Sequence, residues 1–469
     1  MRLRDSLTNH LRSPAIWLAA AVTVGAVLRF TWNSDMEFKA DEHQMFELSQ
    51  HIGREEPWPV LGIPSGVGLR NPGMSVWVFV ALARVFHAST PLQLDRAVVT
   101  LNVLAFVALL LFICWAVPPP EREAWFWAAA LAAFSPMSLI LQRKIWAQSV
   151  LPLFCVLFLV GWWRRDRRWG AVVWGAVGAA LGQIHMSGFF FAAGMFLWTA
   201  AFSAQRFGRK PIRWAAWAVG SALGFAPAIP WFRYLLTRTA HGPGWNPMLA
   251  MNLQFLRNVY VDAFGLGLDY SLGGDTPAFL HASPFASTAI HPVLYLHAAC
   301  MALSLILTAW VIRAGWRGRA TLRDLVSRIG HSSETAFAIA GALAGFGLLI
   351  TLSGVPIYRH YLIVTFAFEW LLVAHLALRH ARWPRWLLGS LLVSQLGLST
   401  SFLVYIHEHG GAPHGDYGFA YRVQHTRLPR TIDYRRDAAT EARHLRLPPP
   451  GAPPTRRAPT SAPPQASAR

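Results

Sequence analysis

The chain has 469 residues, of which 54% are hydrophobic and only 14% are charged. A soluble chain usually carries nearer about a quarter charged residues, so this composition excludes an ordinary soluble globular protein. The formal net charge of +19 could suit a nucleic-acid partner. However, the arginines gather in short loops between apolar runs, which is typical of the inward-facing loops of membrane proteins. We therefore expect a membrane protein without a nucleic-acid partner.

Apolar runs long enough to cross a hydrocarbon core of about 30 Å as helices recur along the chain. The clear runs are 14–32, 97–117, 124–141, 147–163, 169–185, 187–203, 213–232, 291–312, 335–353, 360–378 and 386–405. The first run follows a basic stretch but no small-residue cleavage site follows it, so we read it as a retained span. A further run, 73–88, has Arg84 inside it and is too short to be a typical span.

The basic loops decide how these runs are oriented. If 73–88 does not span, the Arg-rich segments 164–168, 204–213 and 313–328 all face the cytoplasm. If it does span, all of them face outward and the positive-inside rule is inverted. The sequence therefore predicts an all-α polytopic membrane protein with about 11 transmembrane helices and a cytoplasmic N-terminus. The high Arg, Ala and Pro usage suggests a GC-rich bacterial genome, and the expected location is a bacterial inner (plasma) membrane.

This topology divides the chain into a membrane domain and two following segments. The membrane domain covers 1–405, with a long first outer loop at 33–95 that carries membrane-surface helices and a second outer loop at 233–290. An extracytoplasmic segment covers 406–445, and a Pro/Ala/Arg-rich tail at 446–469 is expected to be disordered. Both outer loops and the turns QRKIWAQ, GQIHMSG and SGVPIYRHY are predicted to meet on one outer face.

The first outer loop contains the adjacent carboxylates Asp41 and Glu42 in the stretch FKADEHQMFELSQHI. On a helix that starts near Lys39, Asp41 shares a stripe with Met45, Leu48 and Ile52. A carboxylate on such an apolar face is costly unless it is paired or used. The alternative is that both acids only supply negative charge to the first turn of a helix.

Several cations are predicted at the outer ends of the spans, against the charge bias of such loops. They are Arg96, Arg143, Lys144, Arg359 and His360. Any one of them could simply reach toward lipid phosphates. Together, beside an acidic loop, they fit a site that holds the phosphate of a lipid headgroup.

Other ionisable residues allow more than one interpretation. His185, between two spans, fits a packing residue, and Glu369, inside a predicted span, fits either a pair with a neighbour or a functional group. The late stretch HEHGGAPHGDYGFAY could bind a metal or form an ordered loop. Walker A, GxGxxG, HExxH and CxxC motifs are absent from the sequence. A nucleotide-driven enzyme with a soluble catalytic domain is therefore not expected.

The Asp-Glu pair, the arginine at the start of the second span, SPMSLILQRKIWAQSVLPLF and YRHYLIVTFAFEW together resemble a known family. They resemble the GT-C polyprenyl-phosphate-sugar glycosyltransferases, in the family 39-like group of protein mannosyltransferases, aminoarabinose transferases and galacturonosyltransferase-like proteins. The resemblance covers roughly 14–405. The chain departs from the family at Gln148, where an Asp is usual nearby, and at Phe46, where the aromatic residue after the acidic pair is displaced.

The resemblance implies a transferase that moves a sugar from a polyprenyl-phosphate donor to a glycan, lipid or protein acceptor of the envelope. Asp41 would be the catalytic carboxylate with Glu42 beside it, and Arg96, Arg143 and Arg359 would match the family's arginines near the phosphate. A phosphate leaving group needs cations to stabilise its charge, and the acceptor hydroxyl needs a base. No cofactor is required by this chemistry, and a divalent cation stays open.

Two other classes stay open at this point. A secondary transporter should show inverted repeats, broken helices and polar residues near the midplane. A lipid-linked glycan ligase or polymerase would use the same donors on the same face as the transferase. The sugar, the acceptor and the oligomeric state are not determined by the sequence.

Overall fold

A computed structural model describes residues 14–66, 68–202, 210–237, 248, 253–282, 291–317 and 332–427. The chain divides into two compact units, Met1–Thr426 and Arg427–Arg469, and the account below concerns the first. The predicted disordered tail 446–469 lies outside the described residues. So do residues 1–13 and parts of the loops 233–290 and 313–328.

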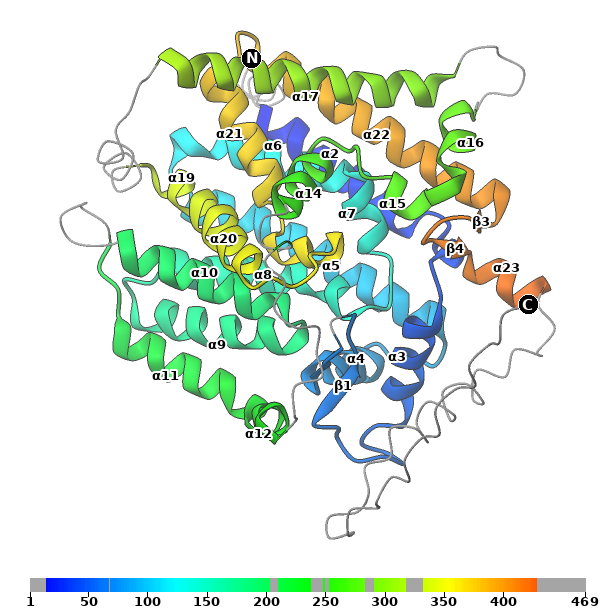
Figure 1. Ribbon diagram of the computed structural model, residues 1–469, viewed down its shortest axis with the longest axis vertical. Coiled ribbons are helices and arrows are strands. Elements are labelled where there is room, and N and C mark those ends of the chain that lie inside the picture. Colours follow the sequence, from blue (N-terminus) through cyan, green and yellow to red (C-terminus); the bar gives the residue numbers. More distant parts are fainter. Residues whose placement is uncertain are drawn as a thin grey trace, which may run out of the picture. The chain divides into compact units, whose positions relative to one another are not determined.

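Helices make up most of the first unit (Figure 1). In the first half of the chain the α-helices are α2 (Pro14–Phe30), α3 (Ala40–His51), α4 (Met74–Val85), α5 (Pro91–Ala116), α6 (Arg122–Phe134), α7 (Pro136–Leu141), α8 (Leu151–Trp163), α9 (Arg168–Ile184) and α10 (Ser187–Phe202). In the second half they are α11 (Trp214–Phe225), α12 (Ile229–Thr237), α14 (Gln254–Ala263), α15 (Asp269–Leu272), α16 (Thr276–His281), α17 (Pro292–Arg317), α19 (Glu334–Ile339), α20 (Phe346–Leu352), α21 (Phe368–His380), α22 (Pro384–His409) and α23 (Tyr421–Arg427).

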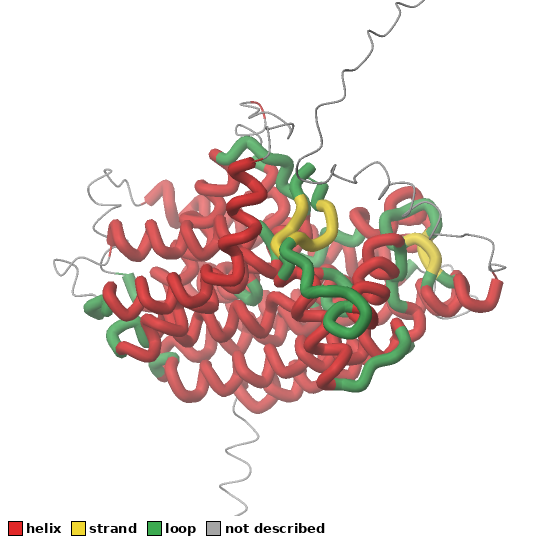
Figure 2. Tube along the Cα trace, turned by 90° about the horizontal axis from the view of Figure 1, so that it is seen from below, coloured by secondary structure: helices red, strands yellow, loops and turns green. Residues whose placement is uncertain are grey.

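Shorter elements link these helices. The 3-10 helices are η1 (Asn33–Asp35), η2 (Pro119–Glu121), η3 (Ala147–Val150), η5 (Ala226–Ala228), η6 (Gly273–Asp275) and η8 (Arg359–Thr365), and a π-helix, η7 (Ala340–Gly345), joins α19 to α20. Two antiparallel strand pairs, β1 (Leu61–Pro64) with β2 (Arg70–Pro72) and β3 (Gly411–Ala412) with β4 (Gly418–Phe419), lie among the loops (Figure 2). The prediction of an all-α chain was therefore slightly too simple.

Local sequence signals set several helix ends. Thr90 caps α5, where its side chain accepts from the backbone N–H of Gln93 and Pro91 occupies the first turn. Pro136 lacks the N–H that would continue α6, so the chain breaks at Ser135 into α6 and α7. Gly410, with φ 72°, ends α22 in the left-handed region that favours glycine.

Five described helices are long and apolar enough to cross a membrane: Pro91–Ala116, Trp214–Thr237, Pro292–Trp316, Glu334–Leu352 and Pro384–His409. A sixth candidate span joins η8 to α21 across a bend of 70°. Shorter apolar helices lie at Ile16–Phe30, Met74–Val85, Ala147–Trp163 and Ser187–Phe202. The chain is a helical membrane protein, and its predicted total of 11 spans stays a prediction.

Two of the predicted runs can be compared directly with helices. The run 73–88 forms α4, whose 12 residues extend only about 18 Å, less than the hydrocarbon core of about 30 Å. The run 360–378 was predicted as one span, and the structure shows it as a bent pair of helices rather than one continuous helix. Its chain breaks at Phe366 and Ala367, where Ala367 adopts φ 71°, and α21 then starts in a new direction.

α6 lies at the centre of the packing. Its residues 124–134 are buried except for the half-buried Phe126, and the helix contacts α2, α5, α21 and α22. A helix that is apolar on every side is typical of a buried position. Beside this core, α9 packs between α10 and α11, as Figure 1 shows for the three neighbouring helices. The small side chains of α6 and the glycines of α9 and α11 allow such close approach.

Candidate active site

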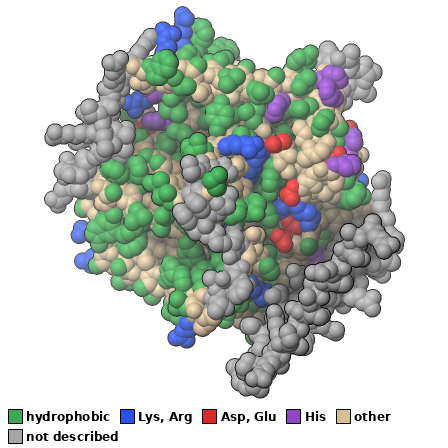
Figure 3. All heavy atoms as spheres, viewed as in Figure 1, with side chains coloured by type: hydrophobic (Ala, Val, Ile, Leu, Met, Phe, Trp, Pro, Cys, Tyr) green, Lys and Arg blue, Asp and Glu red, His purple; other side chains and the backbone are tan. Residues whose placement is uncertain are grey.

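The contacts bring together the segments that were predicted to share an outer face. The turn after α7 contacts the first loop through Lys144, and the segment before α21 contacts both that turn and the turn between α9 and α10. The second outer loop joins them through Arg359 and Asp269. The face seen in Figure 3 shows acidic and basic side chains side by side within largely apolar surroundings. This meeting of segments distant in the sequence defines the candidate site.

The Lys144 cluster, which we define as Glu37, Lys39, Glu42, Lys144 and Asp416, is the centre of this site. The Lys144 ammonium lies 2.6 Å from Glu37 Oε1 and 3.3 Å from Glu42 Oε1, and all three side chains are buried. Lys39 is only half-buried and lies 2.5 Å from the same Glu37 oxygen and 3.2 Å from Asp416 Oδ1. Two cations therefore share one buried carboxylate.

Burial and neighbouring charge act against each other in this cluster. Burial opposes the charge of Lys144, but Glu37 and Glu42 outweigh it and raise the pKa of the ammonium. For Glu42, burial raises the pKa of the carboxyl, Lys144 offsets this only in part, and Glu37 adds to the increase. A buried charge without a partner would be far more costly. Lys144 is therefore held as a cation by the acids of the first loop.

The position of Asp41 corrects the predicted face of α3. Asp41 is exposed, whereas Glu42, Met45 and Ser49 form the buried stripe. The physical reason is that Glu42 finds the Lys144 ammonium at the buried side and accepts a hydrogen bond from the Lys39 backbone N–H at 2.8 Å. Asp41 Oδ2 accepts a hydrogen bond from Trp146 Nε1 at 3.1 Å. Asp41 is thus the accessible carboxylate of the pair, and Glu42 holds the cluster together.

Trp146 links Asp41 to a group of rings, the ring cluster, which comprises Trp146, His185, Tyr358, His360 and Tyr361. The indole lies 3.8 Å from Lys144 Nζ and its ring centroid is 4.6 Å from that of His360. His360 stacks on Tyr358, and its centroid lies 6.1 Å from that of His185. The charged cluster therefore ends at a wall of aromatic and imidazole rings.

His185 is neutral in this environment. Its Nδ1 lies 2.7 Å from Ser187 Oγ, and burial lowers the pKa of the imidazole to about 3. The interpretation of His185 as a packing residue accounts for these contacts, although its ring also faces Tyr361 at 5.2 Å.

Arg143 and Arg359 were predicted to surround a phosphate, and both already have partners. Arg143 donates to the backbone oxygens of Thr31 and Trp32 at 2.7 and 2.9 Å, so it ties the end of α2 to the turn. Arg359 donates to Gly267 O and lies 3.1 Å from Asp269 Oδ1 and 4.0 Å from Asp262 Oδ1. Burial raises the pKa of Asp262 to about 7, with Arg359 opposing and Asp269 reinforcing the increase.

Arg96 and Glu369 have different surroundings from those expected. The Arg96 side chain is exposed, and among the described residues its guanidinium forms no hydrogen bond or ion pair. Glu369 was placed within a continuous span, but it lies in the first turn of α21, directly after the bend. Thr365 donates a hydrogen bond to one of its carboxylate oxygens, and the other oxygen is buried without a partner.

The histidines at the end of α22 and in the segment after it do not converge on one point. His407 lies 2.6 Å from Asp35, His414 lies 2.8 Å from Asp275, and His409 stacks on Tyr405. Within the described ranges, no group of three or more His, Cys, Asp or Glu side chains is arranged to hold a metal ion. His407 instead fastens the end of α22 to η1, and His414 fastens the segment after α22 to η6.

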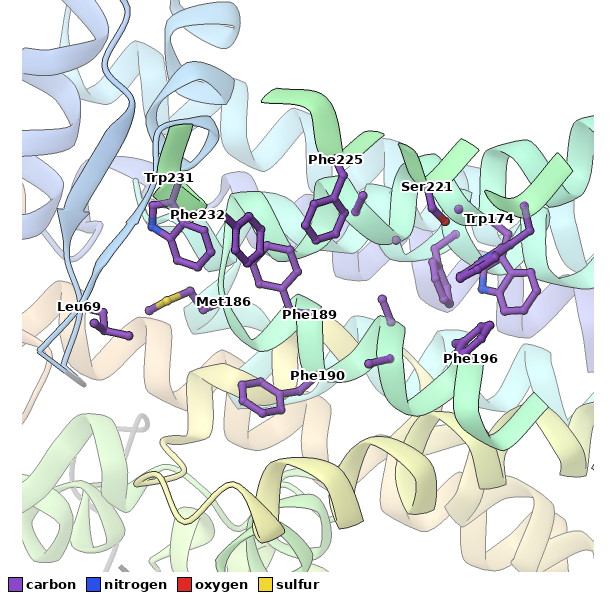
Figure 4. A pocket seen from close by; sticks show the side chains of 17 residues that line it. Leu69, Trp174, Met186, Phe189, Phe190, Phe196, Ser221, Phe225, Trp231 and Phe232 are labelled. Atoms are coloured by element: carbon purple, nitrogen blue, oxygen red, sulfur yellow. The ribbon is translucent and has the colours of Figure 1, made fainter. Parts of the chain in front are cut away.

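An apolar cavity of about 540 Å³ has in its wall Met186, the chain neighbour of His185 of the ring cluster. It lies between α9, α10, α11 and α12, and Leu69 of the β1–β2 loop contributes to its wall (Figure 4). Met186, the residue after His185, lies at the Leu69 end, and Trp174 and Phe196 lie at the other (Figure 4). Trp231 Nε1 donates to Arg70 O at 2.9 Å and so fixes the hairpin to α12. The cavity is shaped for an apolar ligand.

Sequence reasoning missed Glu37, Lys39 and Trp146 as parts of the site. Glu37 and Lys39 are charged residues two positions apart directly before α3, which was a signal for a charged segment in extended chain. Trp146 follows the Arg-Lys pair of the turn, a position from which an indole can cover a lysine. Asp262 and Asp269, the partners of Arg359, carry no comparable local signal.

Comparison with known proteins adds one likeness. No protein-family model matches the chain, and no curated protein matches it. The chain is similar to the crystal structure of the Archaeoglobus fulgidus oligosaccharyltransferase in the apo form, with 14% sequence identity and a TM-score of 0.41. The match covers 95% of this chain and 61% of that chain, so this chain spans about three fifths of the length of that protein. The function of this chain is therefore inferred from its own residues.

Proposed function

We propose that the chain is an integral-membrane glycosyltransferase that moves a sugar from a polyprenyl-phosphate donor to an envelope acceptor. The observation that carries this proposal is the accessible Asp41 carboxylate, which Trp146 links to the Lys144 cluster and to the ring cluster. Met186, the residue after His185 of the ring cluster, lines an apolar cavity. The acceptor hydroxyl requires a carboxylate as base, the donor phosphate requires cations, and the polyprenyl chain requires an apolar cavity.

In the proposed reaction, Asp41 accepts the proton of the acceptor hydroxyl while the acceptor oxygen attacks the anomeric carbon of the sugar. The bond between that carbon and the phosphate oxygen breaks, and the polyprenyl phosphate leaves with the bonding electrons. Trp146 holds Asp41 through its indole N–H. A carboxylate in this position contributes about 10²–10⁴-fold to the rate as a general base.

Two cations are open to the donor phosphate. Lys39 is half-exposed, and Arg96 is exposed. Lys144 and Arg143 are buried, so they would support the phosphate from behind these side chains. The polyprenyl chain would lie in the apolar cavity, with its head near Met186 and the ring cluster. The site would face the extracytoplasmic side of a bacterial inner membrane, with 11 spans and the N-terminus inside.

The test is mass spectrometry of envelope lipids, glycans and glycoproteins from deletion, wild-type, Asp41→Asn and Glu47→Gln strains. Glu47 lies on the same helix and is half-exposed, so Glu47→Gln is the matched control. We expect the deletion and Asp41→Asn to lose the same sugar, while Glu47→Gln retains it and all proteins are present at equal levels. Loss of a whole repeat unit would indicate a ligase or polymerase instead.

One specific observation favours the alternative that the protein is a transporter. η8 and α21 form a broken helix with a 70° bend, and Glu369 lies at the break with one unpartnered oxygen. Transporters place binding sites at broken helices. An unchanged set of envelope glycans in the deletion strain would favour this class over the transferase.

A further inference from the structure

A second cavity lies at the far ends of the helices that form the candidate site. Its volume is about 700 Å³, and it is lined by the start of α6, the start of α19, the end of α21 and the start of α22. Polar and apolar side chains share its wall, among them Leu378, Arg379, Trp383 and Trp386. Neither the proposed transfer reaction nor its donor uses this cavity.

Two arginines of this cavity form no ion pair with any acid in the described part of the chain. Arg385 is neutralised by Glu123, with Nε 2.7 Å from one carboxylate oxygen and a second hydrogen bond of 3.1 Å to the other. Glu121 accepts from the backbone N–H of Thr335 at 3.1 Å. Among the described residues, neither Arg379 nor Arg382 forms an ion pair, and the Arg382 guanidinium lies 4.7 Å from the Trp383 ring centroid. The wall therefore offers two guanidinium groups to an anion.

The cavity lies at the opposite membrane surface from the Lys144 cluster. α22 is a candidate span of 26 residues, which extends about 39 Å and so exceeds a hydrocarbon core of about 30 Å. His407, at one end of α22, contacts Asp35 of η1, and Arg385 and Trp386, at the other end, line the cavity. The two sites are therefore separated by the length of this helix.

The surface around the cavity is rich in arginine. Arg165, in the turn between α8 and α9, pairs with Glu334 of α19, the neighbour of Thr335 in the cavity wall. Arg164 and Arg167 belong to the same turn, and Arg168 begins α9. Such a density of arginine marks the cytoplasmic side of a membrane protein. The lipid leaflet on that side carries anionic headgroups, which attract basic side chains.

Two tryptophans favour a lipid over a soluble anion. Trp383 is 56% exposed and Trp386 is 80% exposed. Exposed tryptophans at span ends are typical of the depth at which lipid headgroups lie. An anion held by Arg379 and Arg382 would therefore sit at headgroup depth, with acyl chains free to pass along α22.

We infer that this cavity binds the phosphate headgroup of an anionic glycerophospholipid from the cytoplasmic leaflet. The inference is independent of the proposed sugar transfer, because it uses none of the same residues.

The test is native mass spectrometry of the delipidated full-length protein in a neutral detergent. Phosphatidylglycerol, phosphatidylcholine with the same acyl chains, and soluble glycerol 3-phosphate are titrated separately. We expect a one-to-one adduct with phosphatidylglycerol, little with phosphatidylcholine, and a loss of affinity of about tenfold or more in Arg379→Gln/Arg382→Gln. Trp383→Ala/Trp386→Ala should also weaken binding while keeping both arginines.

The control is Arg167→Gln/Arg168→Gln, which removes two exposed arginines from the same surface outside the cavity. It should bind phosphatidylglycerol as the wild type does, and all variants should keep the wild-type melting temperature. If this control loses as much affinity for phosphatidylglycerol as Arg379→Gln/Arg382→Gln does, only general surface charge attracts the lipid. Equal binding of phosphatidylcholine, or of glycerol 3-phosphate at the same concentration, would overturn the assignment to an anionic lipid.

Discussion

Asp41 and Glu42 are neighbours in the chain, yet one side chain is exposed and the other is fully buried beside Lys144. Their roles should therefore separate experimentally. Asp41 is placed to meet a substrate, whereas Glu42 and Lys144 hold the first loop on the turn after α7. The same reasoning gives Trp146 a positioning role, because its N–H reaches Asp41 while its face covers Lys144.

Lys144→Met should destabilise the protein by about 3–5 kcal/mol, because it leaves Glu37 and Glu42 buried without their cation. Asp41→Asn should leave stability within about 0.5 kcal/mol, since the Asp41 side chain is exposed. Thermal unfolding of both variants in the same detergent checks this difference. Equal melting temperatures for Lys144→Met and the wild type would show that the buried cluster contributes no stability.

His185 should make the protein sensitive to acid. The folded state holds the pKa of this imidazole at about 3, below its ordinary value near 6.5. Protons therefore bind the unfolded chain first, and the stability from neutral His185 is complete above about pH 6.5 and falls as the pH drops toward 3. Between pH 7 and pH 5, the melting temperature of His185→Gln should therefore fall less than that of the wild type.

The control for this pH series is His409→Gln, since His409 is exposed. This variant should keep the wild-type pH dependence. If His185→Gln also keeps it, other groups control the acid sensitivity.

At the scale of elements, the tight seam between α9 and α11 is the clearest feature. A Cβ at Gly220 would lie 2.1 Å from the backbone oxygen of Val172, far inside van der Waals contact. Helices in lipid gain little from hydrophobic burial against each other, so close packing of small residues matters more. Gly175 of α9 and Gly220 and Gly224 of α11 all lie at this contact, so both helices contribute small residues to it.

Gly220→Ala should therefore destabilise the protein by about 1–3 kcal/mol, because α11 must move away from α9. Gly315→Ala provides the matched change, since a Cβ there meets nothing within 4 Å on α17. It should be neutral or stabilise by up to about 1 kcal/mol. If the melting temperatures of the two variants shift by the same amount, the close contact between α9 and α11 does not explain the effect of Gly220→Ala.

Sequence periodicity explains both the success and the failure at α3. It predicted a helix after Lys39, and α3 begins at Ala40. Spacing could not fix which side of that helix is buried, because Asp41 and Glu42 both align with Met45 within one turn. The buried side is set by Lys144, about one hundred residues later, because its ammonium pairs with the Glu42 carboxylate there. The local spacing of residues cannot predict a partner that lies so far away in the sequence.

The bend before α21 was unpredictable for a different reason. The stretch YLIVTFAFEW contains neither glycine nor proline, yet Ala367 adopts a positive φ that non-glycine residues seldom take. The surrounding packing holds this conformation. By contrast, the meeting of the two outer loops and three turns could be predicted, because charge bias alone fixes which loops share a face.

For the whole molecule, the predicted topology makes the two ends of α22 accessible from opposite sides. In a background without Cys114, Glu408→Cys and Arg382→Cys place thiols at the two ends of this helix, both at exposed positions. We expect a membrane-impermeant maleimide to label Glu408→Cys in spheroplasts, and Arg382→Cys only after permeabilisation. The reverse pattern would place the candidate site in the cytoplasm and exclude the proposed extracytoplasmic reaction.

Three rings close one end of the apolar cavity. Phe196 stacks on Trp217 at 4.5 Å, and Trp174 lies 5.7 Å from the same indole. A prenyl chain that entered beside Met186 would meet this wall after a few isoprene units, and its remainder would have to leave between the helices into the bilayer. Donors shortened to those first units should thus react as well as full-length ones, whereas a bulkier ring at Ala193, in the cavity wall, should shorten the chain that is accepted.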